Sequence, residues 1–330
     1  MNFFQIISEI EKVDPEVYDR LDSRRSVFKH MSGLGQKLAA AAVPLAVGAI
    51  FNKAYGQSPA GLSAVNVLNF ALKLEYLEKY FYQLRPTALF SSVNQAALSL
   101  IATDESNHVS FLTTVINQVS PGSAFADPTV TAFDYTAGGA FPTALTSADT
   151  YLALAQSFED TGVRAYKGAA PLTNVMANKT VLTAALNIHS VEARHASHIR
   201  AMRRAGSPSS QSNPAQGVAV SPYDARPKSW VSGTDNGGAA APTTAGIYGA
   251  GNDTGAATYG ANSATGSAAG VTFLAESNIT QGGVALSGST ITAGASFPST
   301  AFSEAFDEGL DVGTVTAIAK LFVRTGYTVF

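Results

Sequence analysis

The sequence contains two Glu-x-x-His motifs, and each lies in a stretch with the periodicity of an amphipathic helix. Glu105 and His108 form the first motif, and Glu192 and His195 form the second. Residues three and four apart lie on one face of a helix, so each motif interrupts a stripe that is otherwise apolar. A carboxylate in a helical core is costly unless a cation or a proton neutralises it. The spacing therefore predicts that positive charge lies opposite each motif.

Two further helical stretches each carry a single glutamate on an apolar stripe. Glu75 lies on one, with Tyr82 two turns further on, and Glu159 lies on the other, with Tyr166 two turns further on. Four buried carboxylates would carry a charge of about −4, which two divalent ions would neutralise. Mixed carboxylate and imidazole ligands suit iron or manganese better than zinc. We therefore predict a site for two Fe or Mn ions, and the alternative is that the six side chains share protons.

Other polar residues near the motifs have competing interpretations. Glu78 is the main rival of Glu75, but it lies beside the apolar stripe rather than on it. Asp104 and Asp160 each sit next to a candidate ligand, where a hydrogen bond to an imidazole and exposure to solvent are equally compatible with the sequence. The sequence therefore favours Glu75 as the ligand and leaves the two aspartates open.

The remaining aromatic and histidine residues near the motifs have mostly structural interpretations. Tyr80, Tyr82 and Tyr166 are candidates for oxidisable neighbours of the site, with packing in the core as the alternative for at least two of them. His189 and His198 lie three residues outside the second motif, and we expect them to be neutral structural residues. Tyr82 and Tyr166 are therefore the candidate catalytic residues.

The composition excludes several other classes of protein. The 330-residue chain is 46% apolar and 14% charged, which is typical of a chain with a folded core. Its net charge of −3 and the lack of a basic run give no support for a nucleic-acid partner. The absence of cysteine removes disulfides, thiolate zinc sites, iron–sulfur clusters and cysteine nucleophiles.

Helix-stop signals predict the four helices that must position the candidate site. We expect them at about 62–84, 91–119, 147–168 and 178–205, with proline or glycine beyond each end. The connection over residues 120–146 is long for a compact domain. The sequence therefore predicts a mainly α fold, an antiparallel four-helix bundle with a long crossover between the second and third helices.

Three regions are expected along the chain: 1–57, 58–206 and 207–330. Arg24-Arg25 precedes a 14-residue apolar run, which is similar to a bacterial twin-arginine export signal. The run is shorter than the roughly 20 residues of a membrane-spanning helix, so we expect cleavage near Gly56-Gln57. The alternative for this region is a basic helix start that leads into a core helix.

The C-terminal region, residues 207–330, is rich in Gly, Ala, Ser and Thr. We predict an irregular, β-containing appendage, with short strands at 271–274 and 284–286. Residues 311–323 have the periodicity of a short amphipathic helix. We expect this appendage to pack on the bundle rather than to form a second catalytic domain.

Residues 60–206 resemble the ferritin-like superfamily, in particular the exported ferritin-like domain proteins that include desiccation-related proteins. The resemblance rests on the two Glu-x-x-His motifs and on the segment Leu74–Tyr82, which is similar to the first-helix ligand segment of ferritins. It implies that Glu105 and Glu192 bridge two metal ions. One ion would be completed by Glu75 and His108, and the other by Glu159 and His195. The long C-terminal region and the export signal depart from storage ferritins, which puts cage assembly and iron storage in doubt.

These features together predict an exported dimetal protein of the bacterial periplasm or cell envelope. It would react with O₂ or H₂O₂, as a ferroxidase-like or peroxidase-like oxidoreductase in stress protection. Its expected partners are a small oxidant or Fe(II), the twin-arginine export machinery, and a second copy of the chain in a homo-oligomer. The alternatives are a non-catalytic stress-protective protein with a structural metal site, and a relative of manganese catalase.

Overall fold

The computed structural model describes residues 63–204, 228, 230–231, 233, 244–251, 273–286 and 299–330. The predicted export signal at 1–57 lies outside the described residues. The chain divides into two units, and of the described residues 277–306 belong to one unit and all others to the second. No helix in the described part of the chain combines the length and apolar character needed to cross a bilayer.

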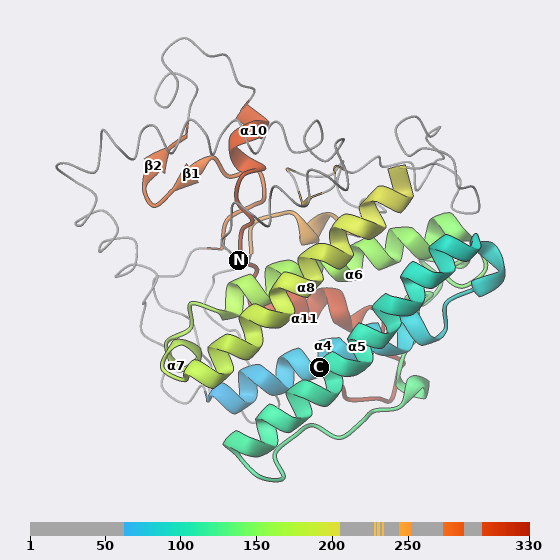
Figure 1. Cartoon of the computed structure of the whole chain (residues 1–330), viewed down its shortest axis with the longest axis horizontal. Coiled ribbons are helices and arrows are strands. Elements are labelled where there is room, and N and C mark those ends of the chain that lie inside the picture. The colour runs from blue at the N-terminus through green and yellow to red at the C-terminus, as the bar shows by residue number, and fades with distance from the viewer. Residues whose placement is uncertain are drawn as a thin grey trace, which may run out of the picture. The chain divides into compact units, whose positions relative to one another are not determined.

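Four long helices form the bundle of the second unit (Figure 1). Their bounds are α4 (Ala64–Gln83), α5 (Ser92–Val119), α6 (Ala148–Ala169) and α8 (Lys179–Arg204). Ser63, Ser91 and Ser147 cap the first three, each accepting a hydrogen bond from a backbone N–H three residues on. Helix α4 packs against α5, and α6 packs against α8. The predicted mainly α, ferritin-like bundle is confirmed, and a short α7 (Thr173–Met176) that was not predicted precedes α8.

An aromatic cluster joins α4 to α6 next to the candidate site. The ring of Phe81 stacks on that of Tyr151 with centroids 4.4 Å apart, and it meets the ring of Phe158 edge-on at 4.9 Å. All three side chains are buried. Large buried aromatic rings dominate the packing energy of a core, so this cluster sets how α4 and α6 face one another.

The long crossover between α5 and α6 lies along α4. The Tyr135 hydroxyl donates to the Leu77 carbonyl at 2.7 Å. The Asn69 side chain donates to the Ser123 carbonyl at 2.8 Å and accepts from the Phe125 N–H at 2.6 Å. A 3₁₀ turn, η2 (Val130–Ala132), lies in the same crossover, and another, η1 (Thr87–Leu89), lies between α4 and α5. The crossover is therefore held in place by buried and part-buried side chains of α4 and of its own sequence.

The predicted C-terminal amphipathic helix is present as α11 (Val312–Lys320). Asp311 caps it, and it buries Val312, Val315 and Ala319. Its buried face packs on α6, and a 3₁₀ turn, η5 (Ala245–Ile247), lies against it. The C-terminal segment thus adds a further helix to the bundle.

The described residues of the other unit contain two short strands and one helix. Strands β1 (Thr280–Gln281) and β2 (Val284–Ala285) pair antiparallel across a two-glycine turn with positive φ angles of 58° and 82°. The same unit holds α10 (Ser299–Ser303). A strand is therefore present within the predicted range 284–286, and its partner is β1.

The predicted strand at 271–274 is wrong for its described residues, Phe273 and Leu274, which have no regular structure. The Phe273 carbonyl accepts from the Gly251 N–H at 2.9 Å. The Leu274 carbonyl accepts from the guanidinium of Arg164 at 2.7 Å. Because these carbonyls bind groups far away in the chain, they do not form a ladder with a neighbouring strand.

Buried Arg164 of α6 connects the bundle to the C-terminal segments of its own unit. Its Nε atom lies 2.8 Å from Glu276 Oε1, and all three guanidinium nitrogens donate to backbone carbonyls. The carbonyl partners are those of Ile247, Gly249, Leu274, Glu308 and Gly309. Burial raises the pKa of Glu276 to about 8 even though Arg164 opposes this shift. The guanidinium therefore donates hydrogen bonds to backbone carbonyls that have no partner in a described helix or strand.

Candidate metal centre

The six side chains predicted to form the site all point into the middle of the bundle. The four glutamates are fully buried, and the two histidines are 7% and 6% exposed. They come from all four long helices: Glu75 from α4, Glu105 and His108 from α5, Glu159 from α6, and Glu192 and His195 from α8. The structure thus brings every candidate ligand together, and their role as ligands stays a prediction.

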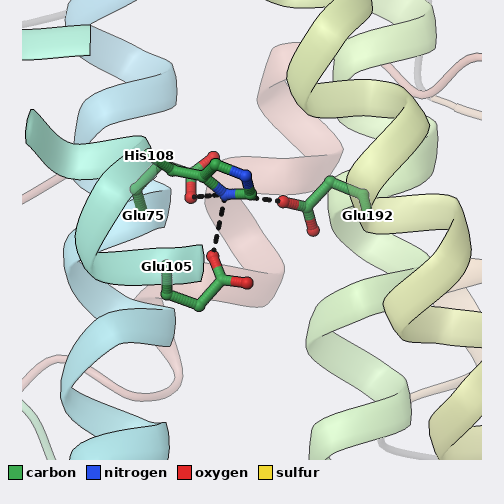
Figure 2. Close-up of side chains that lie close together, drawn as sticks. All are labelled: Glu75, Glu105, His108 and Glu192. Carbon is green, nitrogen blue, oxygen red and sulfur yellow. Dashed lines mark hydrogen bonds and ion pairs between the residues drawn. The ribbon is translucent and has the colours of Figure 1, made fainter. Parts of the chain in front are cut away.

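His108 lies among three carboxylates (Figure 2). Its Nδ1 atom is 3.1 Å from Glu75 Oε2, 3.2 Å from Glu105 Oε2 and 3.4 Å from Glu192 Oε1. A ring nitrogen carries at most one proton, so it cannot donate well to three acceptors at once. This arrangement is the one expected if all four groups face a common cation.

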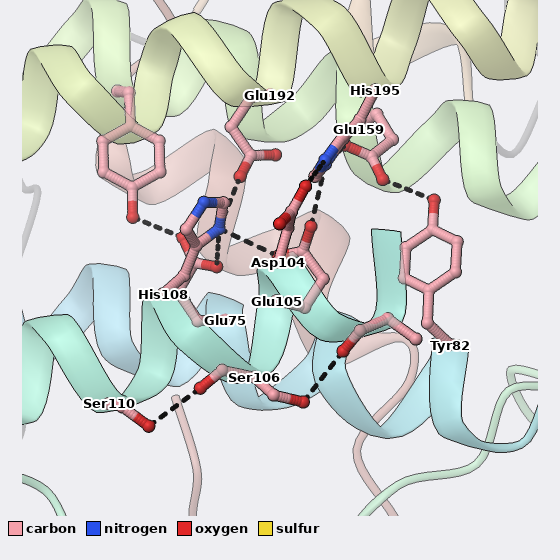
Figure 3. A network of polar contacts seen from close by, with 12 residues as sticks. Glu75, Tyr82, Asp104, Glu105, Ser106, His108, Ser110, Glu159, Glu192 and His195 are labelled. Atoms are coloured by element: carbon pink, nitrogen blue, oxygen red, sulfur yellow. Dashed lines mark hydrogen bonds and ion pairs between the residues drawn. The ribbon is translucent and has the colours of Figure 1, made fainter. Parts of the chain in front are cut away.

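His195 forms the second half of the cluster (Figure 3). Its Nδ1 atom lies 2.9 Å from Glu105 Oε1 and 3.3 Å from Glu159 Oε2. Its Nε2 atom lies 3.2 Å from Asp104 Oδ2. A carboxylate on the far nitrogen fixes the orientation of a ligating imidazole, so of the two interpretations of Asp104 the structure supports the hydrogen bond to an imidazole.

The donor atoms fall into two overlapping sets of four. Within each set, the atoms all lie within 4.8 Å of one another. The first set is Glu75, Glu105, His108 and Glu192, and the second is Glu105, Glu159, Glu192 and His195. Glu105 and Glu192 belong to both sets, as bridging ligands would. The buried cluster is therefore compatible with a dimetal site.

Unpaired buried atoms provide an independent test of whether this cluster fits metal ions. Glu105 Oε1, Glu159 Oε2, both carboxylate oxygens of Glu192 and Nδ1 of His195 have no partner in hydrogen-bonding geometry among the described residues. Of these atoms, His195 Nδ1 lies within ion-pair distance of Glu105 Oε1 and Glu159 Oε2, at 2.9 and 3.3 Å. An unsatisfied buried polar atom costs about 1–3 kcal/mol. Cations placed between these atoms would satisfy them, so the residues fit the predicted ions.

Burial and the neighbouring charges together set the protonation of the cluster. Burial opposes a charge on His108, but Glu75, Glu105 and Glu192 outweigh it and raise the pKa of this imidazole. In the same way, Glu159 and Glu105 overcome burial and raise the pKa of His195 to about 12. Burial, followed by Glu105 and Glu75, raises the pKa of Glu192 well above its usual value. Without metal the cluster must therefore retain protons that a bound cation would displace.

Two tyrosines connect the helices across the cluster. The Tyr82 hydroxyl of α4 donates to Glu159 of α6 (Figure 3), and the Tyr166 hydroxyl of α6 donates to Glu75 of α4. Each tyrosine follows a glutamate of its own helix by seven residues and binds the glutamate of the other helix. Burial raises the pKa of both hydroxyl groups, so both remain donors. They hold the two terminal carboxylates in position.

Two residues outside the predicted ligand set, Glu78 and Asp160, were assigned only in part from the sequence. Glu78 is buried, and burial followed by the charge of Glu192 raises its pKa, but it belongs to neither set of donor atoms. Asp160 is buried and binds Arg200, with Nε to Oδ1 at 3.0 Å. Both interpretations of Asp160, an imidazole partner and a solvent-facing residue, are therefore wrong. Its spacing of four from the polar residues Gln156 and Arg164 on α6 is the signal that could have indicated a second polar face.

Two histidines of α8 outside the cluster were expected to be neutral. Burial lowers the pKa of His189, and burial together with His195 lowers the pKa of His198. Both directions agree with the expectation of uncharged structural residues.

Gly162 makes room for the carboxylate of Glu192. A Cβ atom at position 162 would lie 2.6 Å from Glu192 Oε2. The atom it meets is the end of a flexible side chain, so the carboxylate would move and the helix would not. Glycine at this position therefore serves the site rather than the fold.

Gly162→Ala is expected to weaken metal binding by about 10–100-fold, the usual cost of disturbing a group that orients ligands. The fold should stay intact, because alanine stabilises a helix interior by roughly 0.5–1 kcal/mol relative to glycine. Metal content after dialysis and thermal unfolding would measure the two effects.

Gly168→Ala is the matched control for this prediction, since its Cβ would collide with the backbone carbonyl of Leu310. It should lower the melting temperature and leave metal content unchanged. Equal metal loss in both variants would contradict the role given to Gly162.

Comparison with known families agrees with the fold. Residues 63–205 match a family described as "Ferritin-like domain". The matched segment contains the four long helices and every residue of the cluster. The match and the helical bundle together support placement of this segment in the ferritin-like superfamily. No curated protein and no solved structure shows a significant match to the chain.

Proposed function

We propose that the protein binds two Fe or Mn ions in the bundle and uses them to react with O₂ or H₂O₂. The observation that carries this proposal is the pair of four-atom donor sets that share Glu105 and Glu192. The ferritin-like match of residues 63–205 supports the same class of site. In this proposal Glu75 and His108 complete the first ion site, and Glu159 and His195 complete the second.

When bound, the ions would supply the electrons for oxidant reduction. The chain's own residues prepare the site for them. The four carboxylates match the charge of two divalent ions, and Asp104 fixes the ring of His195. Tyr82 and Tyr166 hold the carboxylates of Glu159 and Glu75 through hydrogen bonds. Apolar residues above and below the cluster exclude water.

A metal assay followed by turnover measurements tests the proposal. The full chain, produced in cells supplied with Fe or Mn, should retain close to two equivalents of metal after gel filtration. It should then oxidise Fe(II) with O₂ or consume H₂O₂. Metal-free protein after production in metal-supplied cells would overturn the proposal.

The two alternative functions give different results in the same assays. A structural site would retain metal without turnover, and chelation would lower the melting temperature sharply. A relative of manganese catalase would release O₂ rapidly from H₂O₂ and oxidise little Fe(II).

We also propose that the chain is exported through the twin-arginine route to the periplasm or cell envelope. The Arg24-Arg25 pair before an apolar run supports this proposal. A buried metal cluster suits a route that carries proteins already folded. Replacing both arginines with lysine should retain the protein inside the cell, and unchanged export of that variant would contradict the proposal.

A further inference from the structure

An apolar cavity of about 30 Å³ lies beside the candidate metal centre. Its walls come from α4, α6, the start of α8 and the C-terminal segment, represented by Leu68, Ala165, Val181 and Val312. Of the described residues that line it, Tyr166 alone carries a polar side-chain group. The cavity is therefore almost wholly apolar, with one polar residue in its wall.

Tyr166 connects this cavity to the cluster. Its hydroxyl donates to Glu75, so a single side chain links the cavity wall to a candidate ligand. Leu310, Val312 and Val315 form another part of the wall and lie outside the segment that matches the ferritin-like domain. The C-terminal segment thus adds to the bundle a wall that the matched domain does not include.

The size and chemistry of the cavity limit what it can hold. A water-sized sphere needs about 10–15 Å³ in a cavity, so there is room for roughly two such spheres. Apolar cavities stay dry and bind small apolar molecules. H₂O₂ carries two O–H donors, and among the described lining side chains only the hydroxyl oxygen of Tyr166 could accept a hydrogen bond from them. A small apolar gas suits this space, and peroxide does not.

We propose that this cavity binds dioxygen and delivers it to the cluster past Tyr166, which makes O₂ rather than H₂O₂ the favoured oxidant. The proposed gas-binding site depends only on the cavity, whereas the preference for O₂ over H₂O₂ rests on the proposed function. The C-terminal segment then has a role in the chemistry of the bundle, because Leu310, Val312 and Val315 help to enclose the gas.

Xenon binding tests the cavity without any turnover. Crystals of the full chain under xenon pressure should show one xenon atom between α4, α6 and the C-terminal segment. Ala165→Val on α6 and Ala71→Val on α4 each add volume to a lining residue and should each abolish that site. Ala148→Val makes the same change on α6 at a residue that does not line the cavity, and xenon binding should be unchanged in this variant. An empty cavity in the wild type, or xenon retained in both filled variants, would overturn the proposal.

Kinetics of the metal-loaded protein test the preference between oxidants. In Ala165→Val and Ala71→Val, the KM for O₂ should rise about fivefold while kcat/KM for H₂O₂ stays within about twofold. An unchanged KM for O₂ despite lost xenon binding would overturn the delivery role. If wild-type protein oxidises nothing but still binds xenon, the proposed function fails and the gas site stands.

Discussion

Glu192→Gln is expected to stabilise the metal-free protein and to weaken the metal-loaded one. Among the described residues, neither carboxylate oxygen of Glu192 has a partner in hydrogen-bonding geometry, and burial with the neighbouring Glu105 and Glu75 raises the pKa of Glu192. A raised pKa means that the carboxyl group contributes full stability below its unfolded-state pKa and loses that contribution as the pH rises. At pH 7 the glutamine variant avoids this loss, so its free energy of unfolding should exceed that of the wild type by about 1–3 kcal/mol.

The same substitution should reverse its effect once metal is bound. Glu192 is one of two residues shared by both donor sets, so glutamine removes a charge from each proposed ion site. We expect metal affinity to fall by roughly 100-fold or more, because disturbing residues that only orient ligands already costs about 10–100-fold. Denaturant unfolding at pH 7 with and without metal, repeated without metal near pH 4, measures the difference in free energy of unfolding between variant and wild type in each condition. The metal-free difference should disappear at the acidic pH, where both proteins are uncharged at this position.

Glu78→Gln is the control for this experiment. Glu78 is also buried near the cluster, and its pKa is also raised, but it belongs to neither donor set. Without metal, Glu78→Gln should be more stable than the wild type. When metal is supplied, it should bind metal as tightly as the wild type. If Glu78→Gln loses metal while Glu75→Gln keeps it, Glu78 takes the place of Glu75 as the ligand on α4. A Glu192→Gln variant that binds metal as tightly as the wild type would contradict the dimetal interpretation.

Arg164→Met is expected to lower the free energy of unfolding by about 3–5 kcal/mol, the usual effect of removing one member of a buried ion pair. Methionine occupies similar space but leaves Glu276 buried without its cation. It also leaves the carbonyls of Gly249, Leu274 and Gly309 without the donor that they share. Urea unfolding at pH 7 measures the loss.

A double-mutant cycle separates the two causes. Adding Glu276→Gln to Arg164→Met should recover part of the lost stability, because glutamine is neutral and no unpaired carboxylate is then buried. Lys79→Met is the surface control: its ion pair with Asp127 is partly exposed, so the expected change is within about 1 kcal/mol. A change of similar size in Arg164→Met would show that the guanidinium does not hold the C-terminal segments in place.

The four long helices and the inward stripe of candidate ligands could be predicted from the sequence because both depend on local spacing. Stop signals lie close to the observed ends of α4, α5 and α6. Glu105 with His108 and Glu192 with His195 share a face simply because they are three residues apart. A charged residue on an apolar stripe must meet a compensating group, and this requirement brings the four stripes together. The gathering of six residues therefore follows from helix geometry and the cost of burying charge.

Tertiary structure alone decided the contacts between segments far apart in the chain. The periodicity of α4 and α6 gives no sign that Tyr82 binds Glu159 while Tyr166 binds Glu75. The burial of Asp160 with Arg200 and the many carbonyl partners of Arg164 also depend on where the C-terminal segments lie. The strand expected at 271–274 was wrong for the same reason, since Arg164 and Gly251 take its carbonyls. Local periodicity specifies which face of a helix is inward, but hydrogen-bond partners across the fold are selected by distances that only the packed chain defines.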